Sequence, residues 1–165
     1  MAQVKLKGSP VHTLYDNIRV GQVFPDFSPL VKTDLSELSL ADLKGKRTIL
    51  NIYPSIDTGT CAKSVKDLNE KASQNSKLEV VCISKDLPFA LDRFFKEHNI
   101  RSVIGASAFR SDFGRQTGLE LKDSPLAGLI ARALIVLDEN HKVLHFELVE
   151  EITVLPNYEK ALSFI

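Results

Sequence analysis

The residue with the clearest chemical potential is Cys61, which lies where a predicted strand gives way to a predicted helix. The stretch from residue 51 to residue 64 reads NIYPSIDTGTCAKS. A thiol attacks only as its thiolate, and the free backbone N–H groups at a helix N-terminus stabilise such an anion. In an open α/β sheet, ligands bind in the crevice beyond the carboxyl ends of the strands. A strand, a turn and a cysteine that opens a helix therefore indicate a reactive thiol.

Three neighbours of Cys61 fit a reactive thiol, but a purely structural interpretation fits them as well. Pro54 ends the strand and stiffens the loop, and Gly59 lets the backbone approach closely. Thr58 is close enough in sequence for its hydroxyl to reach the sulfur or a bound oxygen. Alternatively, Cys61 is a small buried apolar residue on a helical stripe, and Thr58 only caps the helix. The loop residues by themselves leave both interpretations open.

Other chemistries of cysteine fit the sequence poorly. The chain has two cysteines, Cys61 and Cys82, which form neither a C-x-x-C dithiol nor the disulfide framework of a secreted protein. A tyrosine-phosphatase loop would need an arginine at the position of Asp67. No histidine stands at ligand spacing from the cysteines, so no metal site is expected. The histidines are predicted at surface or rim positions: His12, His98, His141 and His145.

Strands and helices alternate on both sides of Cys61, and their apolar patterns show which faces are buried. Val65, Leu68 and Ala72 recur with Cys61 on one face of a predicted helix. The run LEVVCIS is almost continuously apolar, which is typical of a central strand covered on both faces. The full pattern predicts strands or hairpins over 4–14, 47–53, 78–84, 102–107 and 131–149, and helices over 40–45, 61–72 and 157–165.

A further helix is predicted to begin near Pro88, with Asp86 as its cap and Leu91 and Phe95 on its buried face. The strand–helix alternation implies parallel strands joined by right-handed crossovers, and the late hairpin adds antiparallel strands. This order predicts an α/β protein with a thioredoxin-like fold and an N-terminal β-hairpin extension. The length of 165 residues favours a single domain over 1–165.

Composition and charge narrow the classes of partner. Lys plus Arg and Asp plus Glu number 21 each, a balance that argues against a nucleic-acid partner, because such binding needs excess positive charge. No apolar run is long enough to span a membrane, and the first residues lack the apolar core of a secretory signal. We therefore expect a cytoplasmic protein with no membrane and no nucleic-acid partner.

The loop PSIDTGTC resembles the P-x-x-x-T-x-x-C signature of the peroxiredoxins, with Pro54, Thr58 and Cys61 in register. The segments VVCISKDLPFALDRFF, GLIARALIVLDENHKVLHFELVEEIT and PNYEKAL also look like the bacterial thiol peroxidase subfamily. The resemblance covers nearly the whole chain, and it is more specific than the short signature alone.

The resemblance assigns a role to each residue of the signature and to one arginine. Cys61 would be the peroxidatic cysteine, Thr58 would hydrogen-bond the thiolate and the peroxide oxygen, and Pro54 would shield the sulfur from water. Arg132, in GLIARAL, would be the active-site arginine of the family. A guanidinium there would stabilise the thiolate and hold the peroxide. The competing structural interpretation makes Arg132 an ion-pair residue at the start of a strand.

The resemblance also implies a reaction and its partners. The Cys61 thiolate would reduce hydrogen peroxide and organic hydroperoxides through a sulfenic acid, as an antioxidant enzyme. No metal, haem or flavin is required; the reductant would be thioredoxin or a low-molecular-weight thiol. The family commonly forms homodimers, so a homodimer is expected.

One position departs from the subfamily, because Phe95 stands where its resolving cysteine normally lies. Three routes to the reduced enzyme remain: attack on the sulfenic acid by an external thiol, resolution by Cys82, or pairing of two Cys61 residues across subunits. We favour the external thiol, because Cys82 lies in the middle of an apolar strand. The rival hypothesis is a non-enzymatic redox sensor or binding protein, in which Cys61 oxidises once and turns over slowly.

Overall fold

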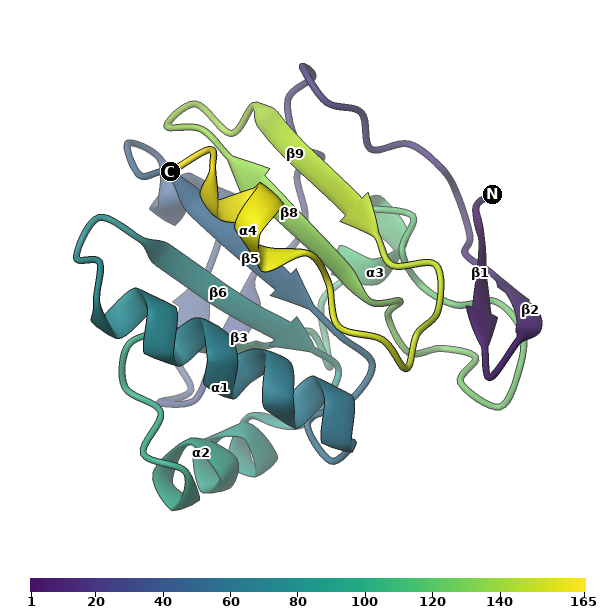
Figure 1. Ribbon diagram of the computed structural model, residues 1–165, viewed down its shortest axis with the longest axis horizontal. Coiled ribbons are helices and arrows are strands. Elements are labelled where there is room, and N and C mark those ends of the chain that lie inside the picture. The colour runs from purple at the N-terminus through teal and green to yellow at the C-terminus, as the bar shows by residue number, and fades with distance from the viewer.

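The centre of the fold is a seven-stranded sheet with the order β4-β3-β7-β6-β5-β8-β9, in a computed structural model that describes residues 1–165 (Figure 1). A separate two-stranded hairpin lies beside it. The strands are β1 (Gln3–Leu6), β2 (Ser9–His12), β3 (Leu30–Lys32), β4 (Glu37–Leu38), β5 (Thr48–Ile52), β6 (Glu79–Ser84), β7 (Ile104–Ser107), β8 (Ala133–Leu137) and β9 (Val143–Leu148). The helices are the 3-10 helix η1 (Leu40–Leu43), α1 (Gly59–Ser73), α2 (Pro88–Glu97), α3 (Phe113–Gln116) and α4 (Tyr158–Leu162).

The strand pairing confirms the predicted thioredoxin-like α/β fold. β5, β6 and β7 are parallel neighbours, with α1 and α2 in the connections that parallel strands require. β8 pairs antiparallel with β5, and β9 pairs antiparallel with β8. The predicted hairpin therefore extends the sheet beyond β5, with β9 as the edge strand. The N-terminal hairpin β1–β2 is present as predicted. No helix combines the length and the apolar character needed to cross a bilayer.

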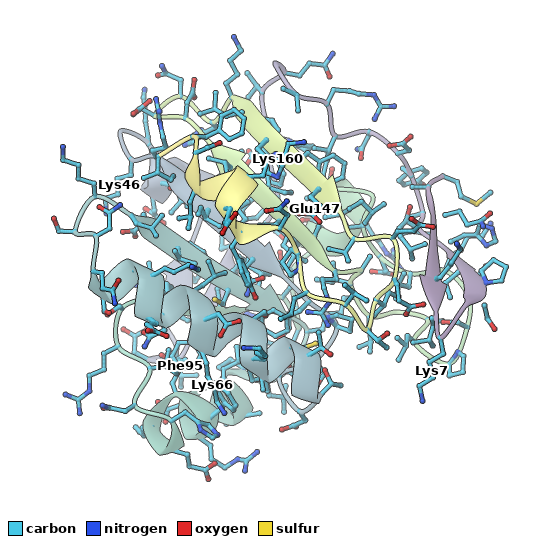
Figure 2. The ribbon with its side chains drawn as sticks, viewed as in Figure 1. Lys7, Lys46, Lys66, Phe95, Glu147 and Lys160 are labelled. Carbon is cyan, nitrogen blue, oxygen red and sulfur yellow. The ribbon has the colours of Figure 1, made fainter.

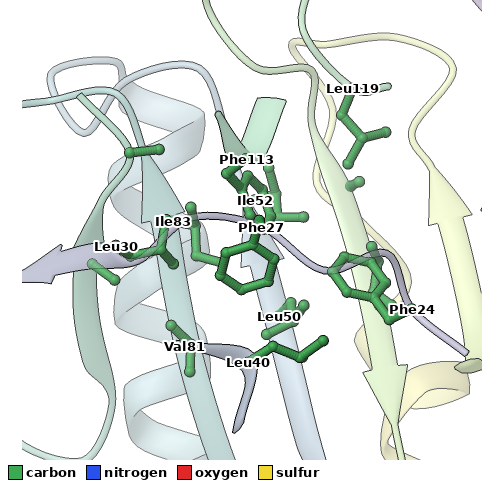
Figure 3. Packing of buried hydrophobic residues seen from close by; sticks show 14 of the residues in the cluster. Phe24, Phe27, Leu30, Leu40, Leu50, Ile52, Val81, Ile83, Phe113 and Leu119 are labelled. Carbon is green, nitrogen blue, oxygen red and sulfur yellow. The ribbon is translucent and has the colours of Figure 1, made fainter. Parts of the chain in front are cut away.

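Each face of the sheet is covered by its own apolar cluster, because successive side chains of a strand point to opposite faces. Leu50 and Ile52 of β5 pack on one face with the three aromatic rings of Phe24, Phe27 and Phe113 (Figure 3). The rings of Phe27 and Phe113 meet edge to face, with centroids 4.9 Å apart. On the other face lie α1, α2 and α4, which cover the side of the sheet that faces the viewer in Figure 1.

α1 buries the face that its sequence predicts, with one addition. Cys61, Val65, Leu68 and Ala72 are buried, and Ser64 is buried with them. The Ser64 hydroxyl donates to the backbone oxygen of Cys61 at 2.8 Å, so a polar side chain is accommodated under the helix without an unpaired donor.

Two predictions about polar residues are wrong. Leu87, not Asp86, is the N-cap of α2, and no side chain caps this helix; the Asp86 carboxylate instead turns back toward the loop before α1. His145 is buried rather than placed at the surface, because it lies on β9 under the C-terminal segment and stacks on Phe164 at 5.6 Å. Burial lowers the pKa of His145.

Candidate active site

Cys61 is the third residue of α1 and lies just beyond the carboxyl end of the central strand β5. Its side chain is buried, with only 1% of the residue exposed. The first amides of α1 have no intrahelical acceptor, so they present N–H groups and the positive end of the helix dipole at this sulfur. The predicted strand–turn–Cys–helix arrangement is therefore present.

Arg132 meets Cys61 because β8 runs antiparallel to β5. Ala133, the first residue of β8, pairs with Ile52, the last residue of β5, so the residue before β8 lies at the same sheet end as Cys61. Arg132 Nη2 donates to Cys61 Sγ at 3.1 Å, and Arg132 Nε donates to the Ile152 carbonyl at 2.7 Å. Arg132 Nη1 is buried and has no partner in the protein. It is therefore a free donor beside the sulfur.

These residues border a cavity of about 340 Å³ whose walls are mostly apolar. Leu126 and Leu129 come from the loop before β8, Ile152 from the segment after β9, and Leu6 and Lys7 from the N-terminal hairpin. Figure 2 shows Lys7 at the tip of that hairpin. No pattern in the sequence predicts these walls, since segments so far apart in the chain carry no local signal of their meeting.

Pro54 and Thr58 both line this cavity. Pro54 is buried, and Thr58 occupies the N-cap position of α1. The Thr58 hydroxyl makes no capping bond; it donates to the Ser55 carbonyl at 3.1 Å. The alternative in which Thr58 only caps the helix is therefore not supported, and its oxygen keeps lone pairs with which it can accept a hydrogen bond from a ligand.

Glu151 ties the N-terminal hairpin to the segment that carries Ile152. Its carboxylate accepts from the backbone N–H groups of Lys7 and Gly8, both at 3.0 Å, and from the Thr153 hydroxyl at 2.9 Å. Hydrogen bonds from backbone N–H groups lower the pKa of Glu151 from its usual 4.5 to about 2, and the bond from Gly8 contributes most. This carboxylate therefore fixes two walls of the cavity relative to each other.

The depressed pKa of Glu151 predicts a dependence of stability on pH. The contribution of its ionised form to folding is complete above the unfolded pKa of 4.5 and is lost as pH falls toward about 2. The free energy of unfolding of the parent should therefore exceed that of Glu151→Gln most clearly above pH 4.5, and the two should converge at lower pH. Denaturant titrations at several pH values measure this difference. A difference that does not change with pH would contradict the prediction.

Cys82 is a buried strand residue with no sign of a reactive thiol. It pairs with Asn51 of β5 on one side and with Gly105 of β7 on the other. Asn51 Nδ2 lies 3.7 Å from its sulfur, and burial raises the pKa of Cys82 to about 12. A thiol held protonated in a central strand cannot approach Cys61 without breaking the sheet.

Phe95 fills its position as part of the core. It is buried among the residues that pack under α1 and α2, and Figure 2 shows its place on α2. Gly105 of β7 makes room for the ring, because a Cβ at Gly105 would lie only 2.7 Å from Phe95 Cζ. Gly105 thus leaves the space that the phenylalanine ring at position 95 occupies.

Comparisons with known proteins agree with this fold. A family model described as "Redoxin" matches residues 19–162. The chain is 47% identical over 163 residues to the thiol peroxidase of Corynebacterium glutamicum, an alignment that covers 99% of this chain and 98% of that one. It is 44% identical, with the same coverage, to the thiol peroxidase of Mycobacterium tuberculosis.

Solved structures give the same result. A peroxiredoxin-like protein from Aquifex aeolicus superposes with a TM-score of 0.92 at 34% identity, over 98% of this chain and 94% of that one. A thiol peroxidase from Chromobacterium violaceum shares the fold, with a TM-score of 0.89 at 19% identity over the same shares of the two chains. From the family match and the full-length similarity, we conclude that the chain belongs to the redoxin family, among the thiol peroxidases.

Proposed function

We propose that Cys61 is the residue with which this thiol peroxidase reduces peroxides. The observation that carries the proposal is the 3.1 Å contact between Arg132 Nη2 and Cys61 Sγ at the first turn of α1. A guanidinium and the N-terminal end of a helix both favour the thiolate over the thiol. An inert core cysteine needs neither.

The reaction at this site is a displacement on oxygen. The Cys61 thiolate attacks the terminal peroxide oxygen, an S–O bond forms and the O–O bond breaks. The leaving alkoxide or hydroxide takes a proton from water, which replaces the proton that the thiol lost on ionising, and becomes an alcohol or water. The sulfur is left as a sulfenic acid. The hydrogen on the terminal oxygen stays with that oxygen throughout.

The residues around Cys61 supply hydrogen-bonding groups for this transition state and shield it from water. Negative charge moves from the sulfur across the O–O bond, so donors must stand on both sides of it. Arg132 Nη2 already contacts the sulfur, and the unpaired Nη1 is free for a peroxide oxygen. Thr58 Oγ1 donates to Ser55 O and can accept the hydrogen of the terminal peroxide O–H. Pro54, which is buried on the cavity wall, keeps water from the sulfur.

The walls of the cavity favour an organic hydroperoxide as substrate. The surface next to the reacting sulfur is apolar and is formed by Leu126, Leu129 and Ile152. Hydrogen peroxide has no apolar group that could contact this surface, whereas an organic hydroperoxide has one. We expect both hydrogen peroxide and organic hydroperoxides to react, with the larger substrate gaining from apolar contact.

We propose that an external thiol returns Cys61 to its reduced form. Phe95 supplies no sulfur, and Cys82 is held protonated within the sheet. A first thiol attacks the sulfenic sulfur, forms a mixed disulfide and releases water, and a second thiol then displaces the Cys61 thiolate. Thioredoxin, with two thiols, or a low-molecular-weight thiol in a reducing cytoplasm fits this cycle. A homodimer is proposed from the resemblance to the family alone.

Intact-mass analysis tests the cycle. Reduced protein treated with one equivalent of cumene hydroperoxide should gain one oxygen that a sulfenic-acid trap captures on Cys61. Cys82→Ala should behave like the parent, because Cys82 takes no part, and Cys61→Ser should gain nothing. A loss of two hydrogens that joins Cys61 to Cys82 would show that Cys82 resolves. No oxygen gain within seconds would contradict the peroxidase assignment of Cys61.

Turnover distinguishes a peroxidase from the rival redox sensor. With excess peroxide and thioredoxin, or with a small thiol, an enzyme consumes many equivalents of peroxide per Cys61. A sensor stops after one equivalent unless its own partner is added.

A further inference from the structure

We propose that Asp86 is a positioning residue that holds the loop before Cys61 closed, and so controls which reactants reach the sulfur; this rests on the proposed function of Cys61. Asp86 lies in the short connection between β6 and α2, outside the cavity, and takes no direct part in the displacement on oxygen. Its side chain caps neither helix and binds the loop instead.

The contacts of Asp86 join the ends of two strands, β6 and β7, to this loop. Asp86 Oδ1 accepts from the Ser55 hydroxyl at 2.8 Å, and Oδ2 accepts from the Ile56 N–H at 2.7 Å. Oδ2 also accepts from the hydroxyl of Ser84, the last residue of β6, at 2.6 Å. The carbonyl oxygen of Asp86 accepts from the hydroxyl of Ser107 at the end of β7. Hydrogen bonds to a carboxylate are stronger than those between neutral groups, so this is a firm anchor.

Ser55 carries the effect of Asp86 to the reacting centre. The Ser55 hydroxyl is bound to Asp86, while the Ser55 carbonyl accepts from both the N–H of Thr58, at 3.3 Å, and the hydroxyl of Thr58, at 3.1 Å. Thr58 is the N-cap of the helix on which Cys61 lies. A shift of Ser55 therefore moves both the hydroxyl that faces the peroxide and the start of α1.

The closed loop affects the two reactants of Cys61 differently. A hydroperoxide can enter the cavity of about 340 Å³ while the loop stays in place. The thiol of a protein reductant is attached to a much larger body, and the Cys61 residue is only 1% exposed. The loop must therefore open before such a reductant reaches the sulfur. Loosening the Asp86 contacts should slow oxidation and speed access by bulky reagents. A variant that loses stability elsewhere in the fold separates this effect from general destabilisation.

The test compares two rate constants in proteins that all carry Cys82→Ala, so that only Cys61 reacts. One is oxidation by cumene hydroperoxide, and the other is reaction of the reduced thiol with the bulky disulfide 5,5′-dithiobis(2-nitrobenzoate). Asp86→Ala should lower the first by about tenfold, since displaced catalytic groups lose rate steeply, and should raise the second by about threefold through local opening. Ser55→Ala removes one hydrogen bond to the Asp86 carboxylate, so it should change both rate constants in the same directions but by less. This variant replaces Asp86→Ala in the test if Asp86→Ala fails to fold.

Asp112→Ala is the matched control, because its carboxylate also anchors a loop. Asp112 accepts from the N–H of Ser28 at 2.8 Å and from the Ser28 hydroxyl at 2.9 Å, away from the residues that line the Cys61 cavity. It should lose stability but keep both rate constants. Rates in the folded Asp86 or Ser55 variants that equal those of the parent, or that fall together, would overturn the role of Asp86. A parent that does not react with the hydroperoxide would instead overturn the proposed function.

Discussion

Replacing Arg132 by methionine is expected to lower the rate constant for oxidation of Cys61 by cumene hydroperoxide by about 10²- to 10³-fold, the range found when one preorganised donor is removed from a reacting centre. The variant loses the 3.1 Å contact to Cys61 Sγ and also the free Nη1 donor. Methionine keeps most of the apolar volume of the stem, so the change acts mainly on charge and hydrogen bonding.

Arg132→Lys should recover only part of this loss, because an ammonium group cannot contact the Ile152 carbonyl, the sulfur and a peroxide oxygen with one planar fork. Arg47→Met is the matched control. Arg47 also donates to a backbone carbonyl, that of Phe164 at 2.8 Å, but it lies outside the cavity. Competition against a peroxidase of known rate measures each constant. An Arg132→Met variant that reacts as fast as Arg47→Met would rule out the role of Arg132.

Replacing Phe95 by alanine is expected to reduce the free energy of unfolding by about 3–5 kcal/mol, the usual range for removing a buried phenylalanine. Phe95 is only 8% exposed and packs within the cluster under α1 and α2. Phe89→Ala on the same helix is the control, because Phe89 is 67% exposed and its loss should change stability by about 0.5 kcal/mol or less. Denaturant unfolding followed by circular dichroism measures both. Equal losses in the two variants would contradict the core role of Phe95.

Gly105 gives a sharper test of the same contact. Gly105→Ala should cost the parent about 1–3 kcal/mol, because the new methyl group would lie 2.7 Å from Phe95 Cζ. In the Phe95→Ala background, the same methyl group enters space that the ring has left, so the cost should vanish or change sign. This non-additivity is the expected signature of direct contact. Additive effects would show that the two residues do not act as a pair.

The sequence by itself was sufficient for the features that depend on local pattern. The apolar run of β6 predicted a central strand, and the spacing of Cys61, Val65 and Leu68 predicted the buried face of α1. The order of strands and helices predicted the thioredoxin-like fold, which the strand pairing confirms. The motif around Cys61 predicted a cysteine in the first turn of a helix, and the structure places Cys61 there. The strands, the helices and their buried faces follow from patterns within one or two turns of the chain, and the fold class follows from the order of these elements.

The tertiary structure alone decided which distant residues meet. The sequence pattern predicted Asp86 as a helix cap, because an acidic residue just before a helix that begins with proline suits that position. The loop after β5 instead supplies the hydrogen-bond donors to its carboxylate. It placed His145 at the surface, because nothing local shows that Phe164 covers β9. The family resemblance predicted that Arg132 lies beside Cys61, but the contact itself depends on the antiparallel register of β5 and β8. Such partners are set by packing between segments far apart in sequence, and no local periodicity encodes that packing.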